Sequence, residues 1–524
     1  IAVPVLSVKN AANGIKITVT PVGGAESYVI EKETDGVFEV IATLGAKETT
    51  YIDIDVEGDT TYNYRVYATS KDLNSFISDN YEITRLGCPK ITTIKNVLPG
   101  VSLTWTPIDD AVEYEIYRKD EYNTEWEYFT TVTETTYTDG TVFSGEKYTY
   151  TINAITSDGG YSGYDDTGKS ITFVETPDLT KVANTNAGVS VTWEPVDGAV
   201  GYRVYRKVVG GAWGYIGYSA GTSYVDKSKL ASGTKYAYTV IAVNGNFSDF
   251  DSEGISLVYL PTPKITKVAN VQQGVSVSWG AVQGATGYRV YRKAGSATSW
   301  SYIGYSSKNS YIDTKVANGV YYRYTVIAVN GNFSDFDRTG KNIKYVPAPK
   351  LTGVSNAASG IYVKWNAVQG ATEYRVYRRK GGSTSWYCVG TTKNTYYTDK
   401  GIVNASGNYY IYTVIAVNGY YSGFDTTGLT IKRLANPVLK SAVSYKSGIY
   451  VKWDPVKGTT GYYVYRKTAG SGWTIVGTMK GTNSTTFVDK TAKKGVTYTY
   501  TVRACSGKTL SAYNTKGISC KDRY

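Results

Sequence analysis

The stretch GVSVTWEPV at residues 188–196 decides how the rest of the chain is interpreted. Its apolar side chains alternate at Val189, Val191 and Trp193, which is the period of a β-strand with one buried face. An earlier copy, IKITVTPV at residues 15–22, has Val19 in place of the tryptophan. The tryptophan copies lie at Trp105, Trp193, Trp279, Trp365 and Trp453, and therefore recur every 86 or 88 residues. This recurrence predicts a chain of tandem repeats.

A proline opens each repeat, at Pro4, Pro89, Pro177, Pro263, Pro349 and Pro437. We therefore predict six units, at residues 1–87, 88–175, 176–261, 262–347, 348–435 and 436–524. A period of about 87 residues is too long for a helical solenoid and fits a small self-sufficient domain.

The pattern inside each unit predicts an all-β fold. GYRVYRK at residues 201–207 and KYAYTVIAV at residues 235–243 alternate apolar and polar positions, and clusters of Gly, Asn, Asp and Ser separate such segments. No stretch has a convincing helical period. Short strands with one buried face each predict two-sheet sandwiches, and short linkers predict that they form an elongated array.

The composition excludes several classes of function. The 524 residues include no histidine, so triads, cysteine–histidine dyads and histidine-bound zinc are impossible. No phosphate-binding loop or dinucleotide fingerprint is present, and adjacent Asp165 and Asp166 fall far short of a calcium site. The net charge of +12 is spread along the chain rather than gathered in a block, and no apolar run is long enough to span a membrane. We expect no enzyme activity, cofactor, metal, nucleic acid or membrane insertion.

The units resemble fibronectin type III domains over the whole chain. In the third unit the resemblance rests on Trp193, on Tyr202 with Val204, and on the turn from Leu230 to Tyr236. It implies that Tyr236 is a tyrosine corner, whose hydroxyl caps a backbone group at the end of the sandwich. The counterparts of Tyr236 are Tyr62, Tyr148, Tyr322, Tyr410 and Tyr498. The first unit departs most from the pattern, with Val19 and Phe38 at the two tryptophan positions.

A second tryptophan follows the strand that contains Tyr202 and Val204, and this Trp213 is similar to one found in tandem copies on secreted and wall-attached bacterial proteins. Alternation places Tyr205 and Ile241 outward, where Trp213 would lie across them. The same trio recurs in three units, as Tyr205, Trp213 and Ile241, then Tyr291, Trp300 and Ile327, then Tyr377, Trp386 and Ile415. These residues are candidate ligand-binding platforms for sugar rings or proteins. The alternative is that each tryptophan shields its own sheet.

Two smaller features are open to alternative interpretations. The turn with Phe247, Phe250 and Asp251 is either a binding loop or a packed turn in which Phe250 covers the core end and Asp251 makes a local bond. Cys505 and Cys520 are expected on neighbouring strands, where a disulfide is one possibility and free thiols are the other.

These observations predict a non-enzymatic extracellular array, secreted or associated with a cell wall, that acts in adhesion or as a spacer. Its expected partner is an extracellular protein or glycan, and it is expected to belong to a larger parent protein. Two alternatives are a carbohydrate-binding accessory region of a secreted enzyme and a filament-forming subunit.

Overall fold

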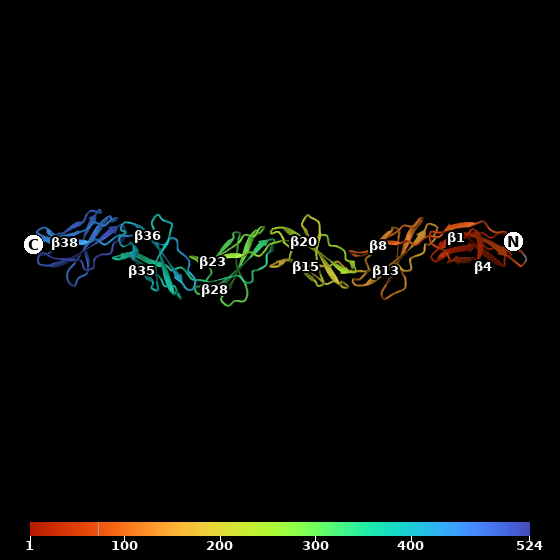
Figure 1. The fold of residues 1–524 in the computed structure, drawn as a ribbon, viewed down its shortest axis with the longest axis horizontal. Coiled ribbons are helices and arrows are strands. Elements are labelled where there is room, and N and C mark those ends of the chain that lie inside the picture. The colour runs from red at the N-terminus through yellow and green to blue at the C-terminus, as the bar shows by residue number, and fades with distance from the viewer. Residues whose placement is uncertain (72) are drawn as a thin grey trace. The chain divides into compact units, whose positions relative to one another are not determined.

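The computed structural model describes residues 1–71 and 73–524, which form two compact units, Ile1–Tyr259 and Leu260–Tyr524 (Figure 1). The first unit contains β1 (Leu6–Ala11), β2 (Gly14–Val19), β3 (Ser27–Thr34), β4 (Val37–Gly45), β5 (Thr50–Asp53), β6 (Thr61–Thr69), β7 (Tyr81–Thr84), β8 (Ile91–Val97), β9 (Gly100–Trp105), β10 (Ala111–Asp120), β11 (Glu127–Val132), β12 (Thr136–Asp139), β13 (Lys147–Thr156), β14 (Lys169–Thr172), β15 (Leu179–Thr185), β16 (Gly188–Trp193), β17 (Gly201–Val208), β18 (Gly214–Ser219), β19 (Ser223–Asp226), β20 (Lys235–Asn244), β21 (Asn246–Phe247) and β22 (Ile255–Val258).

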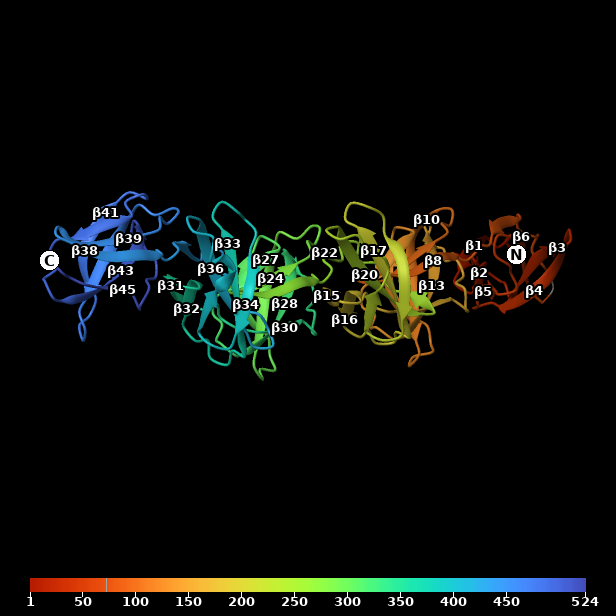
Figure 2. The ribbon, with the colours of Figure 1, turned by 60° about the vertical axis from the view of Figure 1, so that its left-hand side comes forward.

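The second unit contains β23 (Ile265–Val271), β24 (Gly274–Trp279), β25 (Gly287–Ala294), β26 (Ser301–Ser306), β27 (Ser310–Asp313), β28 (Tyr321–Asn330), β29 (Asn332–Phe333), β30 (Lys341–Lys344), β31 (Leu351–Ala357), β32 (Gly360–Trp365), β33 (Glu373–Lys380), β34 (Tyr387–Thr392), β35 (Tyr396–Asp399), the 3-10 turn η1 (Lys400–Ile402), β36 (Tyr409–Val417), β37 (Leu429–Lys432), β38 (Leu439–Tyr445), β39 (Gly448–Trp453), β40 (Gly461–Lys467), β41 (Thr474–Lys480), β42 (Thr486–Asp489), β43 (Thr497–Ser506), β44 (Thr509–Leu510) and β45 (Ile518–Lys521). Figure 2 shows both units turned by 60°.

Each three-stranded antiparallel sheet faces a larger one, and together they form a sandwich. In the segment β15–β22, the order β15-β16-β19 makes the smaller sheet, and β18-β17-β20 with β22 makes the larger one. The remaining sheets of the two units repeat this arrangement. The fold is thus a tandem of fibronectin type III-like β-sandwiches. Every described strand lies inside one of the ranges predicted from the prolines, although those boundaries stay a prediction.

The core of each sandwich is the side that alternation predicted. In the β15–β22 sandwich, Val191 and Trp193 from β16 pack with Val204 from β17 and with Tyr238 and Val240 from β20. The five repeated tryptophans, Trp105, Trp193, Trp279, Trp365 and Trp453, are only 1–4% exposed, as their pattern predicted. Val19, which replaces the tryptophan in the first copy, is equally buried.

The predicted tyrosine corner is confirmed by its hydrogen bond. The Tyr236 hydroxyl accepts a bond from the backbone N–H of Ala231, five residues earlier, at 3.1 Å. Four counterparts make the same bond: Tyr62 with Glu57, Tyr148 with Phe143, Tyr322 with Ala317 and Tyr498 with Lys493. Tyr410 is buried at the corresponding position.

A buried carboxylate joins the two sheets of each sandwich. Asp226, at the end of β19, accepts hydrogen bonds from the Tyr238 hydroxyl (3.0 Å) and from Arg206 Nη1 (2.7 Å). Its other oxygen accepts bonds from the backbone and hydroxyl of Ser228. The guanidinium carbon of Arg206 also lies 5.4 Å from the centre of the Tyr236 ring. The same three-residue group recurs as Lys32–Asp53–Tyr64, Arg118–Asp139–Tyr150, Arg292–Asp313–Tyr324, Arg378–Asp399–Tyr412 and Arg466–Asp489–Tyr500.

The partners of Asp226 keep it ionised. Burial alone would raise its pKa, but the bonds from Ser228, Arg206 and Tyr238 outweigh burial and hold the pKa below its ordinary value. Burial and the neighbouring carboxylate raise the pKa of Tyr238, so that this hydroxyl remains a donor.

The interpretation of Cys505 and Cys520 as a disulfide is wrong. Their strands β43 and β45 do pair, but Cys520 lies opposite Tyr498, whereas Cys505 lies opposite Leu510 of β44. The seven residues from Tyr498 to Cys505 correspond to roughly 23 Å along a strand, far beyond the reach of a disulfide. All four cysteines are free thiols.

We predict that Asp226 makes the β15–β22 sandwich sensitive to acid. Because its pKa is depressed in the folded state, its contribution is present above the unfolded pKa of about 4 and is lost as the pH falls through the folded value. The Asp226→Asn variant should lower the free energy of unfolding at pH 7 by about 3 kcal/mol, since Arg206 loses its buried ionic partner. Between pH 4 and pH 2, about the range of carboxylate titration, the variant should lose less stability than the parent. Calorimetric unfolding of the full chain measures both effects, with the exposed Asp197→Asn as control. Parallel pH profiles for the parent and Asp226→Asn would contradict this role.

Candidate functional site

The predicted platform lies on the outer face of the larger sheet, where a ring from the following turn contacts both its tyrosine and its tryptophan. In the β15–β22 sandwich, Phe250 follows β21 and inserts between Tyr205 of β17 and Trp213, which precedes β18. The ring of Phe250 lies 5.3 Å from that of Tyr205 and 5.4 Å from that of Trp213, edge to face in both cases. Trp213 therefore packs on a turn residue rather than lying across Tyr205 and Ile241.

The three isoleucines of the predicted platform are buried, not exposed. Ile241 is 6% exposed, Ile327 4% and Ile415 6%. Alternation places Ile241 correctly on the outer side of β20, but the following segment returns along the same strand. Ser248 exchanges bonds with the backbone of Ala242, and Gly254 packs against the carbonyl of Tyr238. The isoleucines thus belong to the covered interior of the platform, and its accessible residues are aromatic.

The other two predicted platforms repeat most of this packing. In the β31–β37 sandwich, Phe424 lies 5.2 Å from Tyr377 and 5.3 Å from Trp386. In the β23–β30 sandwich, Tyr291 contacts Phe336 at 4.8 Å and Tyr302 at 5.6 Å. Trp300 there is covered by Lys293, whose Nζ lies 4.9 Å from the centre of the indole ring.

A cation covers each of these outer tryptophans, and at Trp213 a glycine also approaches the ring. Lys207 Nζ lies 4.3 Å from the ring of Trp213, a cation–π contact. Gly254 has φ +63°, and a Cβ there would lie 2.9 Å from Cη2 of the same indole. Cations from the equivalent strand also cover Trp126, Trp300, Trp386 and Trp473. This environment favours the shielding interpretation of the tryptophan.

The turn after β20 divides into a packed part and an exposed part. The Asp251 carboxylate accepts bonds from the backbone N–H groups of Glu253 and Gly254, the local bonding that sequence suggested. Phe250 is half-buried between two rings, whereas Phe247 is 44% exposed. Asp165 is likewise held in a turn, by Thr167.

An exposed arginine that the sequence pattern did not single out lies between two aromatic rings. The Arg203 guanidinium lies 5.7 Å from the ring of Tyr215 and 4.4 Å from that of Phe247. Arg289 repeats the arrangement with Tyr302 and Phe333, at 5.8 and 4.5 Å. Arg375 lies 4.8 Å from Tyr421 in the next sandwich. We call these groups the arginine–aromatic ladders. Their sequence signal was the arginine two residues before each platform tyrosine, together with the identical phrase NGNF in two repeats.

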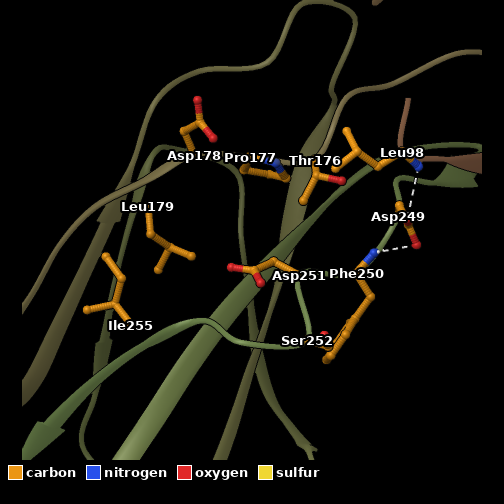
Figure 3. A pocket seen from close by; sticks show the side chains of 10 residues that line it. All are labelled: Leu98, Thr176, Pro177, Asp178, Leu179, Asp249, Phe250, Asp251, Ser252 and Ile255. Atoms are coloured by element: carbon orange, nitrogen blue, oxygen red, sulfur yellow. Dashed lines mark hydrogen bonds between the residues drawn. The ribbon is translucent and has the colours of Figure 1, made fainter. Parts of the chain in front are cut away.

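The cavity in Figure 3 lies in the first unit, where the β8–β14 and β15–β22 sandwiches meet. It has a volume of about 470 Å³, and Asp178, Asp249 and Asp251 line it. The Asp249 carboxylate accepts bonds from the backbone N–H groups of Leu98 and Phe250, so it connects the two sandwiches. Within the described ranges, no group of three His, Cys, Asp or Glu residues could hold a metal ion. None of the helical segments described there is long and apolar enough to cross a membrane.

Comparison with known proteins gives distant similarities. No family model matches the chain. It is 25% identical to receptor-type tyrosine-protein phosphatase eta of Gallus gallus over 389 residues, which cover 70% of this chain and 27% of that protein. It is 23% identical to an amylopullulanase of Thermoanaerobacterium saccharolyticum over 373 residues, covering 57% of this chain and 29% of that one. The chain therefore spans less than a third of the length of these curated relatives.

Two of the solved structures that resemble parts of the chain are domain tandems. The FN1–FN3 domains of chicken CNTN1 cover 49% of this chain and 98% of their own, with 16% identity and a TM-score of 0.20. A two-domain fibronectin type III segment of chicken tenascin covers 32% of this chain and 99% of its own, with 16% identity and a TM-score of 0.17.

We predict that removing Trp213 destabilises its own sandwich. Trp213→Ala deletes the contacts with Phe250 and Lys207 and should lower the free energy of unfolding of the β15–β22 sandwich by about 2 kcal/mol, less than for a core tryptophan because the ring is only half-buried. Tyr215→Ala, at a position 55% exposed, is the control and should cost under about 1 kcal/mol. Denaturant unfolding of the full chain compares the two. Equal stability of Trp213→Ala and the parent would contradict shielding and favour a binding role for the indole.

Proposed function

We propose that the chain is a non-catalytic extracellular spacer region of a longer protein, in which hydrogen-bonded joints hold consecutive sandwiches. The observation that carries this proposal is an asparagine that recurs at these joints. In the first unit, Asn96 Nδ2 donates to the carbonyl of Thr172 in its own sandwich, at 3.3 Å, and to that of Phe247 in the following sandwich, at 3.1 Å.

The second unit uses the same joint twice. Asn270 Nδ2 donates to the carbonyls of Lys344 (3.0 Å) and Tyr421 (2.9 Å). Asn356 Nδ2 donates to those of Lys432 (3.0 Å) and Leu510 (3.1 Å). Each amide group therefore bonds a carbonyl at the end of its own sandwich and one in the hairpin of the next.

A second polar contact, from a different turn, accompanies each asparagine. Ser144 Oγ donates to the carbonyl of Asp197 at 2.9 Å, and Ser406 Oγ donates to that of Lys457 at 2.8 Å. Asn318 Nδ2 donates to the carbonyl of Gln369 at 2.9 Å. Together with the covalent linker, two separate points of attachment restrain both bending and twisting of one sandwich on the next, whereas the linker with one such point leaves rotation about the line through them free. Such joints suit a spacer in which consecutive sandwiches of one unit keep a fixed orientation.

The joint between the β1–β7 and β8–β14 sandwiches uses an arginine as well. The buried Arg85 donates to Asn10 Oδ1 and to the carbonyls of Ala12 and Tyr161, the last in the next sandwich. Burial lowers the pKa of Arg85. Its guanidinium hydrogen-bonds to an amide oxygen and to backbone carbonyls, not to a carboxylate. At this joint the guanidinium of Arg85, rather than an asparagine amide, bonds to both its own sandwich and the next one.

The relatives support an accessory region more than an independent protein. A phosphatase and amylopullulanases, whose chemistries differ, both contain a stretch similar to this chain in less than a third of their length. A part shared by proteins of unrelated activity is best explained as a spacer or accessory part. The absence of histidine agrees with a non-catalytic role.

We predict that the asparagines set the stiffness of the joints. In the triple variant Asn96→Ala, Asn270→Ala and Asn356→Ala, each joint loses bonds worth about 1 kcal/mol, and the spread of angles between neighbouring sandwiches should widen. Electron microscopy of single molecules of the full chain measures those angles. Asn63→Ala, which loses a bond to Glu33 inside one sandwich, is the control and should leave the angles unchanged. An unaltered spread in the triple variant would overturn the proposed role of the joints, and turnover in a hydrolase screen would overturn the non-catalytic assignment.

The arginine–aromatic ladders favour adhesion as a second function. Arg203 and Arg289 present a cation and two rings on an exposed face, the combination that is enriched at protein-binding hot spots and at sugar-stacking surfaces. If adhesion is correct, Arg203→Ser with Arg289→Ser should reduce capture of the full chain on a protein or glycan array. Arg323→Ser, whose side chain bonds Asn342, is the matched control. Unchanged capture by the double variant would place adhesion elsewhere.

A further inference from the structure

The outer face of the β38–β45 sandwich contains a cavity of about 130 Å³ at the position that a ring fills elsewhere. Tyr465, Trp473, Thr501, Arg503 and Tyr513 line it. In the β15–β22 and β31–β37 sandwiches, Phe250 and Phe424 occupy this space, each within 5.4 Å of both the tyrosine and the tryptophan. The cavity is therefore a local departure from a shared pattern.

Two substitutions open the cavity. Tyr513 replaces the phenylalanine, and its ring is 6.2 Å from Trp473; no contact between Tyr513 and Tyr465 is found among the described residues. Arg503 replaces the buried isoleucine found at Ile241 and Ile415. A tyrosine alone does not open the site, because Tyr164 of the β8–β14 sandwich stacks on Tyr117 at 5.8 Å.

Arg503 is held in place through its Nε, while its two terminal nitrogens can still donate hydrogen bonds to a ligand. Arg503 Nε donates to the carbonyl of Ser511 at 2.8 Å, and the guanidinium lies 5.5 Å from the Tyr513 ring. Its terminal nitrogens have no hydrogen-bond acceptor among the residues that the structure describes. Lys467 adds a second cation on the ring of Trp473, and no carboxylate lines the cavity. The charge of the site thus selects an anionic group.

The size and the lining of the cavity select the remainder of the ligand. A cavity of about 150 Å³ holds one benzene-sized ring, so this smaller cavity has room for one six-membered ring at most. The faces of Trp473 and Tyr465 offer a surface for the C–H groups of such a ring. The hydroxyl groups of Tyr465 and Tyr513 are polar partners that favour a hydroxylated ring over an aromatic one, whereas the buried Thr501 hydroxyl already donates to the carbonyl of Asn514.

We propose that this cavity binds one hexuronic acid residue, a pyranose whose carboxylate pairs with Arg503 while its ring lies against Trp473 and Tyr465. Arg503 discriminates between uronic acids and neutral sugars, because a planar guanidinium can bind a carboxylate with two parallel hydrogen bonds. The site is independent of the joints that support the spacer function, because none of its residues takes part in one.

Titration of the full chain with D-glucuronate, followed by tryptophan fluorescence, tests the proposal. We expect saturable binding with a Kd of about 1 mM, as a ligand of this size allows. D-glucose, which lacks the carboxylate, should bind at least about tenfold more weakly, and the fluorescence change should vanish in Trp473→Phe. Absence of saturation with glucuronate would overturn the proposal. Benzoate binding as tight as glucuronate would overturn the preference for a sugar.

The chain itself supplies the matched variant for Arg503. Arg503→Ile restores the residue found at Ile241 and should retain the fold while weakening glucuronate binding by about 10- to 100-fold, the loss expected for a charged hydrogen bond. If Arg503→Ile does not fold, Arg503→Gln replaces it as the test. This variant keeps a polar side chain of similar length, and its glucuronate binding should be weakened by the same factor. Trp213→Phe, in a sandwich whose cavity is filled, is the control and should leave binding unchanged. Unaltered glucuronate affinity in a folded Arg503 variant would refute the assignment.

Discussion

The buried carboxylate between the sheets is the interaction on which each sandwich depends. Asp226 ends a strand of the three-stranded sheet, while Tyr238 and Arg206 lie on two strands of the larger sheet, so their hydrogen bonds cross the core. Apolar packing is nondirectional and tolerates a sliding of one sheet on the other, whereas a charge out of water must keep its partners. In a domain of this size, where the core is small, this group fixes the relative position of the two sheets.

Much of the fold was predictable because the alternation of apolar and polar residues, together with the repeated tryptophan, identifies the side of each strand that faces the core. The carboxylate group was not predicted, although an aspartate ends the same short strand in every repeat, as in Ser223–Asp226. An aspartate after an apolar run is usually a turn residue, and local sequence cannot distinguish the two environments. The buried state of Ile241 was missed for a related reason: alternation identifies the side of a strand, but the cover comes from the segment after the strand, where Ser248 pairs with Ala242 and Gly254 lies against the carbonyl of Tyr238.

The covered outer face changes which residues are available to a partner. Trp213 lies between a lysine, a glycine and a phenylalanine, so most of its surface already has intramolecular neighbours. The exposed aromatic surface lies instead beside Arg203 and Arg289, where cation–π contacts keep rings ordered in solvent. Where the covering ring is displaced, as at Tyr513, the same scaffold leaves space for a small ligand. The same outer face is therefore covered in the β15–β22 sandwich, where a ladder lies beside the covering ring, and hollowed in the β38–β45 sandwich, where two positions differ.

The hairpin that follows the strand Lys235–Asn244 connects the joints to this exposed surface. The carbonyl of Phe247 accepts the bond from Asn96 across the joint, while its ring lies against Arg203 on the outside. Tyr421 has the same two roles, with its carbonyl bonded to Asn270 and its ring beside Arg375. In each hairpin the backbone carbonyl of one aromatic residue bonds to the preceding sandwich, while the side chain of that residue lies on the outer face. A joint that restrains rotation consequently also fixes the direction of the ladder beside it. Spacing and adhesion are therefore compatible uses of one structural element, because stiffness in the joint determines where an exposed ring points.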